Sequence, residues 1–189
     1  MPAGMFNRPY QYTIISTGAT ASVRFSYDAP DVLPHGAHFE RVVTLPADAR
    51  YITVDERVDF PSAPGDSQQR AVSVTSLDVG PTPLAYLPEE TTLAAGSTTP
   101  VAQGSALGYF SATTGELATI AWRAGDVEGA AVLGKPPSAI ARLPLASGRT
   151  AHLLFGYSAV KDREGVAREL ARLEALAQGA PPTPANSRH

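Results

Sequence analysis

The sequence contains no cysteine. This excludes disulfide bonds, thiolate metal ligands and cysteine nucleophiles. A protein without cysteine is equally suited to oxidising and reducing surroundings, so the redox compartment stays open.

Lysine is almost as scarce, since Lys135 and Lys161 are the only two lysines among 15 basic residues. The formal net charge is -3 and the isoelectric point is about 5.8. No run of lysine or arginine forms the basic stripe that would bind a phosphate backbone. We therefore expect no nucleic-acid partner.

Long apolar runs are also missing. No window approaches the roughly 18 apolar residues of a membrane-spanning helix. The first residues, Met1 to Pro9, lack the apolar core of a signal peptide. These observations predict no membrane span and favour a cytoplasmic protein. The compartment stays undetermined, because a chain from which a signal had been removed would look the same.

No motif of a known chemistry is present: neither a nucleophile elbow, nor a phosphate-binding loop, nor a four-ligand metal set. His35 and His38, with Asp31 or Glu40, could hold a metal ion in a loop. Residues three apart in a strand face opposite ways, and no further ligand accompanies the histidines. An ordinary polar loop is the favoured interpretation, and we expect no metal and no other cofactor.

What the 189-residue chain does have is 43% hydrophobic and only 17% charged residues, a balance typical of a packed core. Residues 20–28 alternate between apolar and polar and predict a strand, which forms a hairpin with a strand at 10–17. Further strands are predicted at 39–45, 51–60, 70–79, 107–112, 117–123, 130–133, 139–145 and 150–157. So many short strands separated by turns predict a mainly antiparallel β-sandwich.

Residues 161–178 form the one convincing helical pattern. Val166, Leu170, Leu173 and Ala177 recur at helical spacing. Asp162 or Ser158 is the predicted N-cap, and Gly179 stands where a helix C-terminus favours glycine. The favourable i,i+4 pair is Glu164 with Arg168.

The organisation predicted is one β-sandwich domain over 1–179, followed by a disordered tail at 180–189. Residues 80–104 are rich in proline, threonine and serine and are interpreted as a long surface excursion. The alternative is a linker that splits the chain near 88–104 into two small β domains.

The run from Gly108 to Asp126, followed by the strand that ends at His152–Tyr157, resembles the late strands of galactose-mutarotase-like supersandwich domains. The cadence of strands extends this resemblance to about residues 39–157. Such domains occur as accessory or catalytic units in carbohydrate-active proteins, so the resemblance implies a sugar-related β-sandwich. The chain is shorter than a full supersandwich.

Mutarotases of that fold use two histidines and a glutamate around the sugar ring. The strand register assigns these roles to none of His35, His38, His152 and Glu56. The resemblance therefore implies an accessory domain more readily than an epimerase.

Aromatic and charged side chains of the stretch 107–157 make up the candidate ligand-binding set. Aromatic rings suit the apolar faces of pyranose sugars, and charged groups bind their hydroxyls. The candidates are Trp122, Tyr109 and Tyr157 for stacking, and Arg123, Asp126 and Glu116 for hydroxyls. Trp122 also alternates with Ile120 and Ala118, which favours a core position, so both interpretations stay open.

Glu56 falls on the apolar face of the strand predicted at 51–60, beside Val54 and Val58. Burial raises the pKa of a carboxyl group and costs free energy unless the charge is paired. Glu56 is therefore either a buried acid or, in the favoured interpretation, a residue at an irregularity that reaches solvent. His152 is predicted to be a surface or interface histidine.

Three functions fit these observations. The lack of a catalytic constellation in the sequence favours a non-catalytic module that binds carbohydrate or supports a protein partner. The first alternative is a small carbohydrate-active enzyme of mutarotase or lyase type, which would need Glu56 and a histidine in one cleft. The second is a structural protein that assembles into a homo-oligomer through a sheet edge or the C-terminal helix.

Overall fold

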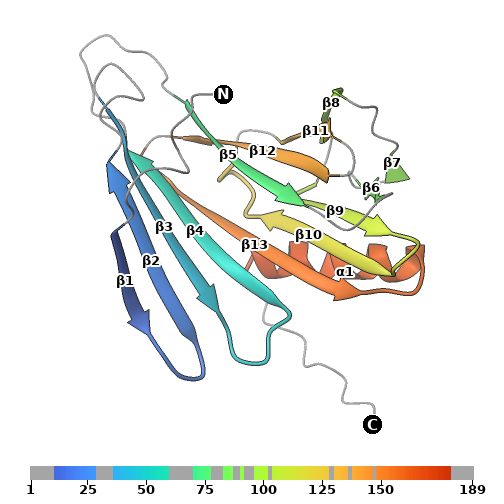
Figure 1. Ribbon diagram of the computed structural model, residues 1–189, viewed down its shortest axis with the longest axis horizontal. Coiled ribbons are helices and arrows are strands. Elements are labelled where there is room, and N and C mark those ends of the chain that lie inside the picture. The colour runs from blue at the N-terminus through green and yellow to red at the C-terminus, as the bar shows by residue number, and fades with distance from the viewer. Residues whose placement is uncertain are drawn as a thin grey trace.

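The computed structural model describes residues 11–28, 36–59, 70–77, 83–86, 90–91, 96–101, 104–127, 130–135, 138–146 and 148–179 (Figure 1). Within these ranges the chain forms thirteen strands and one helix. All the strand pairings are antiparallel, which confirms the predicted mainly antiparallel β fold with one C-terminal helix.

The larger sheet has nine strands. In spatial order they are β1 (Gln11–Ser16), β2 (Ala21–Asp28), β3 (His38–Leu45), β4 (Tyr51–Asp59), β13 (Thr150–Ala159), β10 (Glu116–Trp122), β9 (Ala106–Ser111), β6 (Pro83–Tyr86) and β7 (Glu90–Thr91). The predicted hairpin of the first two strands is confirmed, with Gly18 at a φ of 139° between them.

The smaller sheet has four strands. Its order is β5 (Arg70–Leu77), β12 (Ser138–Ala146), β11 (Ala131–Lys135) and β8 (Thr98–Pro100). Both sheets join early and late parts of the chain, because β4 pairs with β13 and β5 pairs with β12.

Three strands lie within residues 80–104, where the sequence predicts a long excursion: β6, β7 and β8. β6 and β7 extend the larger sheet, and β8 extends the smaller one. Pro83 opens β6 and Pro100 ends β8, positions where a strand tolerates a residue without an N–H donor. Because these strands have only two to four residues, they show no alternation that a sequence pattern could reveal.

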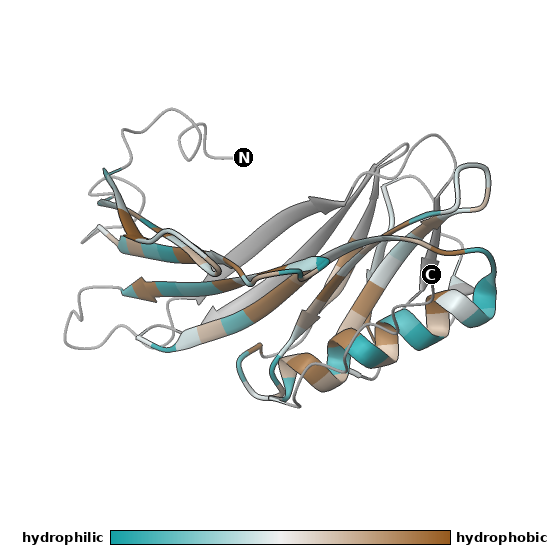
Figure 2. Ribbon diagram, turned by 90° about the horizontal axis from the view of Figure 1, so that it is seen from below, coloured by the Kyte–Doolittle hydropathy of each residue, from teal (hydrophilic) through white to brown (hydrophobic). Residues whose placement is uncertain are grey.

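The centre of the larger sheet is buried on both faces. On one face, residues of this sheet pack with Val132 of β11 and with two residues that precede β11, Val127 and Ala130. Together they form the inter-sheet core: Val54, Val58, Leu107, Tyr109, Ala118, Ile120, Trp122, Val127, Ala130, Val132, Ala151 and Leu153. On the other face the helix completes the helix core: Ala106, Phe110, Leu117, Ala121, Leu154, Val166, Leu170, Leu173 and Ala177. Figure 2 shows the helix lying along one face of the sheet.

Helix α1 (Arg163–Ala177) confirms the predicted helix and its buried side, Val166, Leu170, Leu173 and Ala177. Asp162 is the N-cap, and its Oδ1 accepts a hydrogen bond of 2.8 Å from the Gly165 N–H. Gly179 follows the helix at a φ of 91°, as its place in the sequence predicts. The helix packs on β9, β10 and β13.

Two glycines let the helix approach the sheet closely. A Cβ atom on Gly156 would lie 2.5 Å from Thr119 Oγ1 and 2.7 Å from Leu173 Cδ1. A Cβ atom on Gly108 would lie 3.2 Å from Leu170 Cδ2. Thr119 Oγ1 also donates a 3.2 Å hydrogen bond to the Gly156 carbonyl. At these two positions the helix side chains pack directly on the backbone of the sheet, and there is no room for a side chain on the sheet.

Polar side chains fix the C-terminal half of the helix to the sheet. Glu174 Oε1 accepts hydrogen bonds from the Ser105 N–H at 2.7 Å and from Ser105 Oγ at 2.8 Å. Gln178 Nε2 donates to the Trp122 carbonyl at 3.0 Å, and Gln178 Oε1 accepts from the Ala124 N–H at 3.0 Å. These bonds satisfy backbone groups beside β9 and β10 and fix the helix lengthwise.

Truncating the buried side of the helix tests its contribution to stability. Leu170 is 6% exposed, so Leu170→Ala is expected to lower the free energy of unfolding by about 2–4 kcal/mol through lost transfer energy and a cavity. Urea denaturation followed by circular dichroism measures the change. The matched control is Leu176→Ala, the same truncation at a half-buried position, and it is expected to cost clearly less. Equal losses for the two variants would contradict the packing described.

Adding one methyl group at Gly156 tests the close approach. Gly156→Ala is expected to destabilise the protein by about 1–3 kcal/mol, because the new methyl group would overlap Thr119 Oγ1 and Leu173 Cδ1. The Thr119 hydroxyl is hydrogen-bonded to the Gly156 carbonyl and Leu173 is buried, so neither can move away freely. Gly108→Ala, with wider contacts, is expected to cost less. Thermal unfolding of both variants and the parent measures the order of their stabilities. A Gly156→Ala protein as stable as the parent would contradict the close packing and show that the helix can shift outward.

Candidate functional site

The face of the larger sheet that the helix covers continues onto β2, β3 and β4, and there it is charged. Strand register places alternate residues of these strands and of β13 on this one face. We call this surface the polar face; its charged members are Arg24, Asp28, His38, Glu40, Asp55, Arg57, Asp59 and His152.

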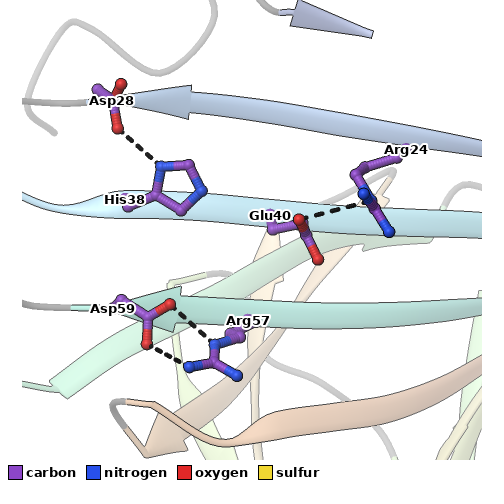
Figure 3. Close-up of polar contacts among 6 residues, drawn as sticks. All are labelled: Arg24, Asp28, His38, Glu40, Arg57 and Asp59. Atoms are coloured by element: carbon purple, nitrogen blue, oxygen red, sulfur yellow. Dashed lines mark hydrogen bonds and ion pairs between the residues drawn. The ribbon is translucent and has the colours of Figure 1, made fainter. Parts of the chain in front are cut away.

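Opposite charges alternate on the polar face and pair both across neighbouring strands and along β4 (Figure 3). His38 Nδ1 lies 2.7 Å from Asp28 Oδ1, at an exposed position. Arg57 holds Asp59 with two hydrogen bonds, of 2.8 Å from Nε and 3.0 Å from Nη2. The bonds from Arg57 lower the pKa of Asp59, and those to Asp59 raise the pKa of Arg57.

His152 is the most constrained histidine of this face. Its Nδ1 lies 2.6 Å from Asp55 Oδ1, and its backbone N–H donates to Asp126 Oδ2 at 2.9 Å. The side chain of His152 is 33% exposed. A ring whose Nδ1–H donates to a carboxylate keeps the lone pair of Nε2 for a ligand or a proton. The sequence prediction of a surface histidine did not include either carboxylate.

Asp28, His38 and Asp59 lie in one cross-strand row, which invites a metal-site interpretation. Among the described residues, however, no group of three or more His, Asp or Glu side chains converges closely enough to hold a metal ion. His35, the other histidine of the predicted loop, lies outside the described residues. Nor does the described part of the chain include a helix long and apolar enough to span a bilayer.

Two of the six predicted ligand-binding residues are in the inter-sheet core. Trp122 is 5% exposed and Tyr109 is fully buried, so neither ring offers a face to a ligand. Burial raises the pKa of the Tyr109 phenol. The core interpretation of Trp122 therefore describes its position, and the stacking interpretation does not.

Tyr157 and Glu116 meet at one end of the β10–β13 pair. Tyr157 is diagonal to Glu116 across the two strands, and its side chain is 55% exposed. Glu116 accepts hydrogen bonds from the Tyr157 hydroxyl and, at 2.8 Å, from Thr114 Oγ1. These bonds lower the pKa of Glu116, and the bond to Glu116 raises the pKa of Tyr157.

Arg123 and Asp126 lie at the other end of the same strand pair. The Arg123 N–H donates to the His152 carbonyl at 3.1 Å, and the Asp126 N–H donates to the Arg123 carbonyl at 3.1 Å. At about 3.3 Å per residue, the five residues from His152 to Tyr157 separate the two groups by about 16 Å. The six predicted residues therefore form two surface pairs and a buried pair, and no single cluster.

Glu56 lies on the apolar face, as its alternation with Val54 and Val58 indicates, and its side chain is only 13% exposed. Arg41 lies opposite in β3 and donates to Glu56 Oε1, with a distance of 3.2 Å from Nε. The signal for this pair is present in the sequence, because Arg41 interrupts the apolar alternation of residues 39–45 in the same way.

Comparison with known proteins identifies a fold. No family model and no curated protein matches the sequence. Among solved structures, an alpha-N-acetylgalactosaminidase, NagBb from Bifidobacterium bifidum, is similar with a TM-score of 0.67 and 8% identity over 90% of this chain and 31% of that chain. The Slr1438 protein from Synechocystis is similar with a TM-score of 0.50 and 9% identity over 80% of this chain and 66% of that chain.

A putative aldose 1-epimerase from Klebsiella pneumoniae is also found, with a TM-score of 0.45 and 8% identity over 89% of this chain and 59% of that chain. At these identities the similarity establishes a fold and nothing finer. The similarity of fold to the first two structures is consistent with the predicted resemblance to galactose-mutarotase-like supersandwich domains. The chain spans about a third of the length of the glycosidase that it matches.

Removing the Tyr157 hydroxyl tests the geometry of the exposed pair. In Tyr157→Phe the pKa of Glu116 is expected to rise toward its ordinary value, because the largest cause of its depression is lost. The pair stabilises the fold above the unfolded-state pKa of Glu116, and this contribution is lost as the pH falls through the folded-state pKa. Carbon-detected NMR titration of the carboxyl group measures the shift. Thr114→Ala is the control and should raise the pKa less.

Proposed function

We propose that this chain is a non-catalytic β-sandwich module of a carbohydrate-active system. The observation that carries the proposal is the structural similarity of 90% of the chain to 31% of an alpha-N-acetylgalactosaminidase. A unit that recurs as a part of a larger glycosidase fits an accessory role, in which the module binds or positions a sugar chain for chemistry performed elsewhere.

Within this proposal, Tyr157 and Glu116 form the sugar contact. The Tyr157 ring is more than half exposed on a paired strand, so little conformational entropy is lost when a pyranose stacks on it. Glu116 is held by Tyr157 and Thr114 and has carboxylate lone pairs left to accept from sugar hydroxyls. An exposed ring beside an oriented carboxylate offers a face for stacking and acceptors for hydroxyl groups, two kinds of contact that a pyranose can make.

His152 supports the alternative, a small carbohydrate-active enzyme of mutarotase type. Its Nδ1 contact with Asp55 suits a general base, since the carboxylate orients the ring and stabilises the imidazolium that proton transfer creates. Glu56, which the same alternative needs, lies on the opposite face of the sheet, where Arg41 pairs with it. This separation favours the binding module.

Titration with a panel of mono- and oligosaccharides, followed by amide NMR shifts, tests the proposal. Binding with a dissociation constant of roughly micromolar to millimolar strength is expected, with shifts centred on Tyr157 and Glu116. Tyr157→Ala should abolish the shifts. The matched control is Tyr12→Ala, which removes an even more exposed tyrosine from the far edge of the same sheet and should leave binding unchanged.

Two results would contradict the proposal. If no sugar of the panel shifts any resonance, the module does not bind these carbohydrates. If shifts centre on His152 and the protein speeds the mutarotation of freshly dissolved α-D-galactose in a polarimeter, the enzyme alternative replaces it. His152→Ala should then remove the activity.

A further inference from the structure

Strand β1 ends the larger sheet with an exposed, apolar edge. On its outer side no other strand of the described residues pairs with it. Every residue from Gln11 to Ile15 is exposed, and three are large and apolar: Tyr12 at 70%, Ile14 at 59% and Ile15 at 48% exposure. Tyr12 and Ile14 lie on one face of the strand and Ile15 alternates to the other, so neither face is covered.

The composition of β1 does not protect this edge. Its six residues, Gln-Tyr-Thr-Ile-Ile-Ser, include no charge, no proline and no glycine. Edge strands are usually shielded from pairing by lysine, proline or a bulge. The register does shift between Ile14 and Ser16, which leaves Gln11 to Ile14 as the regular, pairing-competent stretch.

We propose that β1 pairs antiparallel with β1 of a second copy of this chain, about a twofold axis at Thr13. Thr13 then lies opposite the partner subunit's Thr13, and Tyr12 lies opposite the partner subunit's Ile14. A twofold axis perpendicular to the sheet keeps the same face up in both copies, so residues that face each other share a side. The two nine-stranded sheets become one continuous sheet.

The absence of charge on β1 and a row of apolar side chains across β1 and β2 both favour a second copy of this chain as the partner. Like charges that lie opposite each other destabilise a strand pair. Because β1 carries no charge, two copies of it can pair without such repulsion. Tyr12 is opposite Phe25 in β2, and Ile14 is opposite Val23. The pairing therefore joins Phe25 and Tyr12 to Ile14 and Val23 of the partner subunit in one row of aromatic and β-branched side chains, which are favourable cross-strand neighbours.

The area predicts a weak dimer. A fully buried tyrosine removes roughly 150–250 Å² from water, so Tyr12, at 70% exposure, has about 105–175 Å² of surface that a partner could cover. With the isoleucines the patch falls short of the roughly 800 Å² per partner of a standard stable interface. Self-association should therefore depend on concentration and appear in the micromolar to millimolar range.

Analytical ultracentrifugation of the full chain from micromolar to near-millimolar concentration tests the dimer, and charge exchange at Thr13 tests its register. Thr13→Lys and Thr13→Glu each place two like charges opposite each other and should weaken self-association by on the order of tenfold. Mixing the two variants places lysine opposite glutamate and should restore association. Circular dichroism of each variant verifies that the sheet is intact, and Tyr157→Ala is the control that should dimerise like the parent.

Three outcomes would overturn the proposal. The first is a protein that stays monomeric throughout the concentration range. A dimer that is indifferent to charge at Thr13 uses another surface, such as the outer side of the helix. Single variants that weaken association without rescue in the mixture show that Thr13 does not face its own copy. The sugar titration of Tyr157 is independent of all three results.

Discussion

The fold depends on the burial of β9, β10 and β13 between two different layers. Residues of these strands that point one way pack under the smaller sheet, and those that point the other way pack under the helix. A strand buried on both faces cannot accommodate large side chains everywhere, and Gly108 and Gly156 are placed where helix and sheet come nearest. The contact of Leu173 with the backbone at Gly156 therefore fixes the distance between the helix and the sheet. The remaining strands extend from this centre.

Beyond the central strands, the helix no longer covers the larger sheet. There the sheet is first amphipathic, in β4 and β3, and then exposed on both faces, in β1. Apart from the Arg41–Glu56 pair, β4 and β3 keep apolar residues on the inter-sheet side and charges on the polar face, while β1 is exposed on both. This gradient separates stability from interaction. The central strands supply the buried area that stabilises the fold, whereas the ends and the outer strands leave polar and apolar groups exposed, and both proposed contacts use such groups.

Local features were predictable because local residues determine them. The helix, its cap at Asp162, the first hairpin and the ten longer strands follow from periodicity, and the structure confirms them. The pairing of β4 with β13 was not predictable, because nothing in either strand specifies a partner about a hundred residues away. The short strands β6, β7 and β8 were missed for lack of any period. The alternation of β10 could not decide whether Trp122 lies in the core or on the surface, because alternation does not reveal that both faces of a strand are covered.

The positions of the candidate site residues could not be predicted from the sequence either. Six residues chosen by chemistry separate into surface and core once the extent of the smaller sheet is known. Along one face of β13, Ala151 and Leu153 are buried, Phe155 is half-buried and Tyr157 is exposed, so the inter-sheet core ends between the last two. Tyr157 is thus an aromatic ring just beyond the rim of a core, on a strand held by both neighbours. Its hydroxyl and Thr114 also fix the carboxylate of Glu116. Such a pair has already lost much of its freedom in folding, so a sugar that binds at the proposed contact would have less conformational entropy to remove.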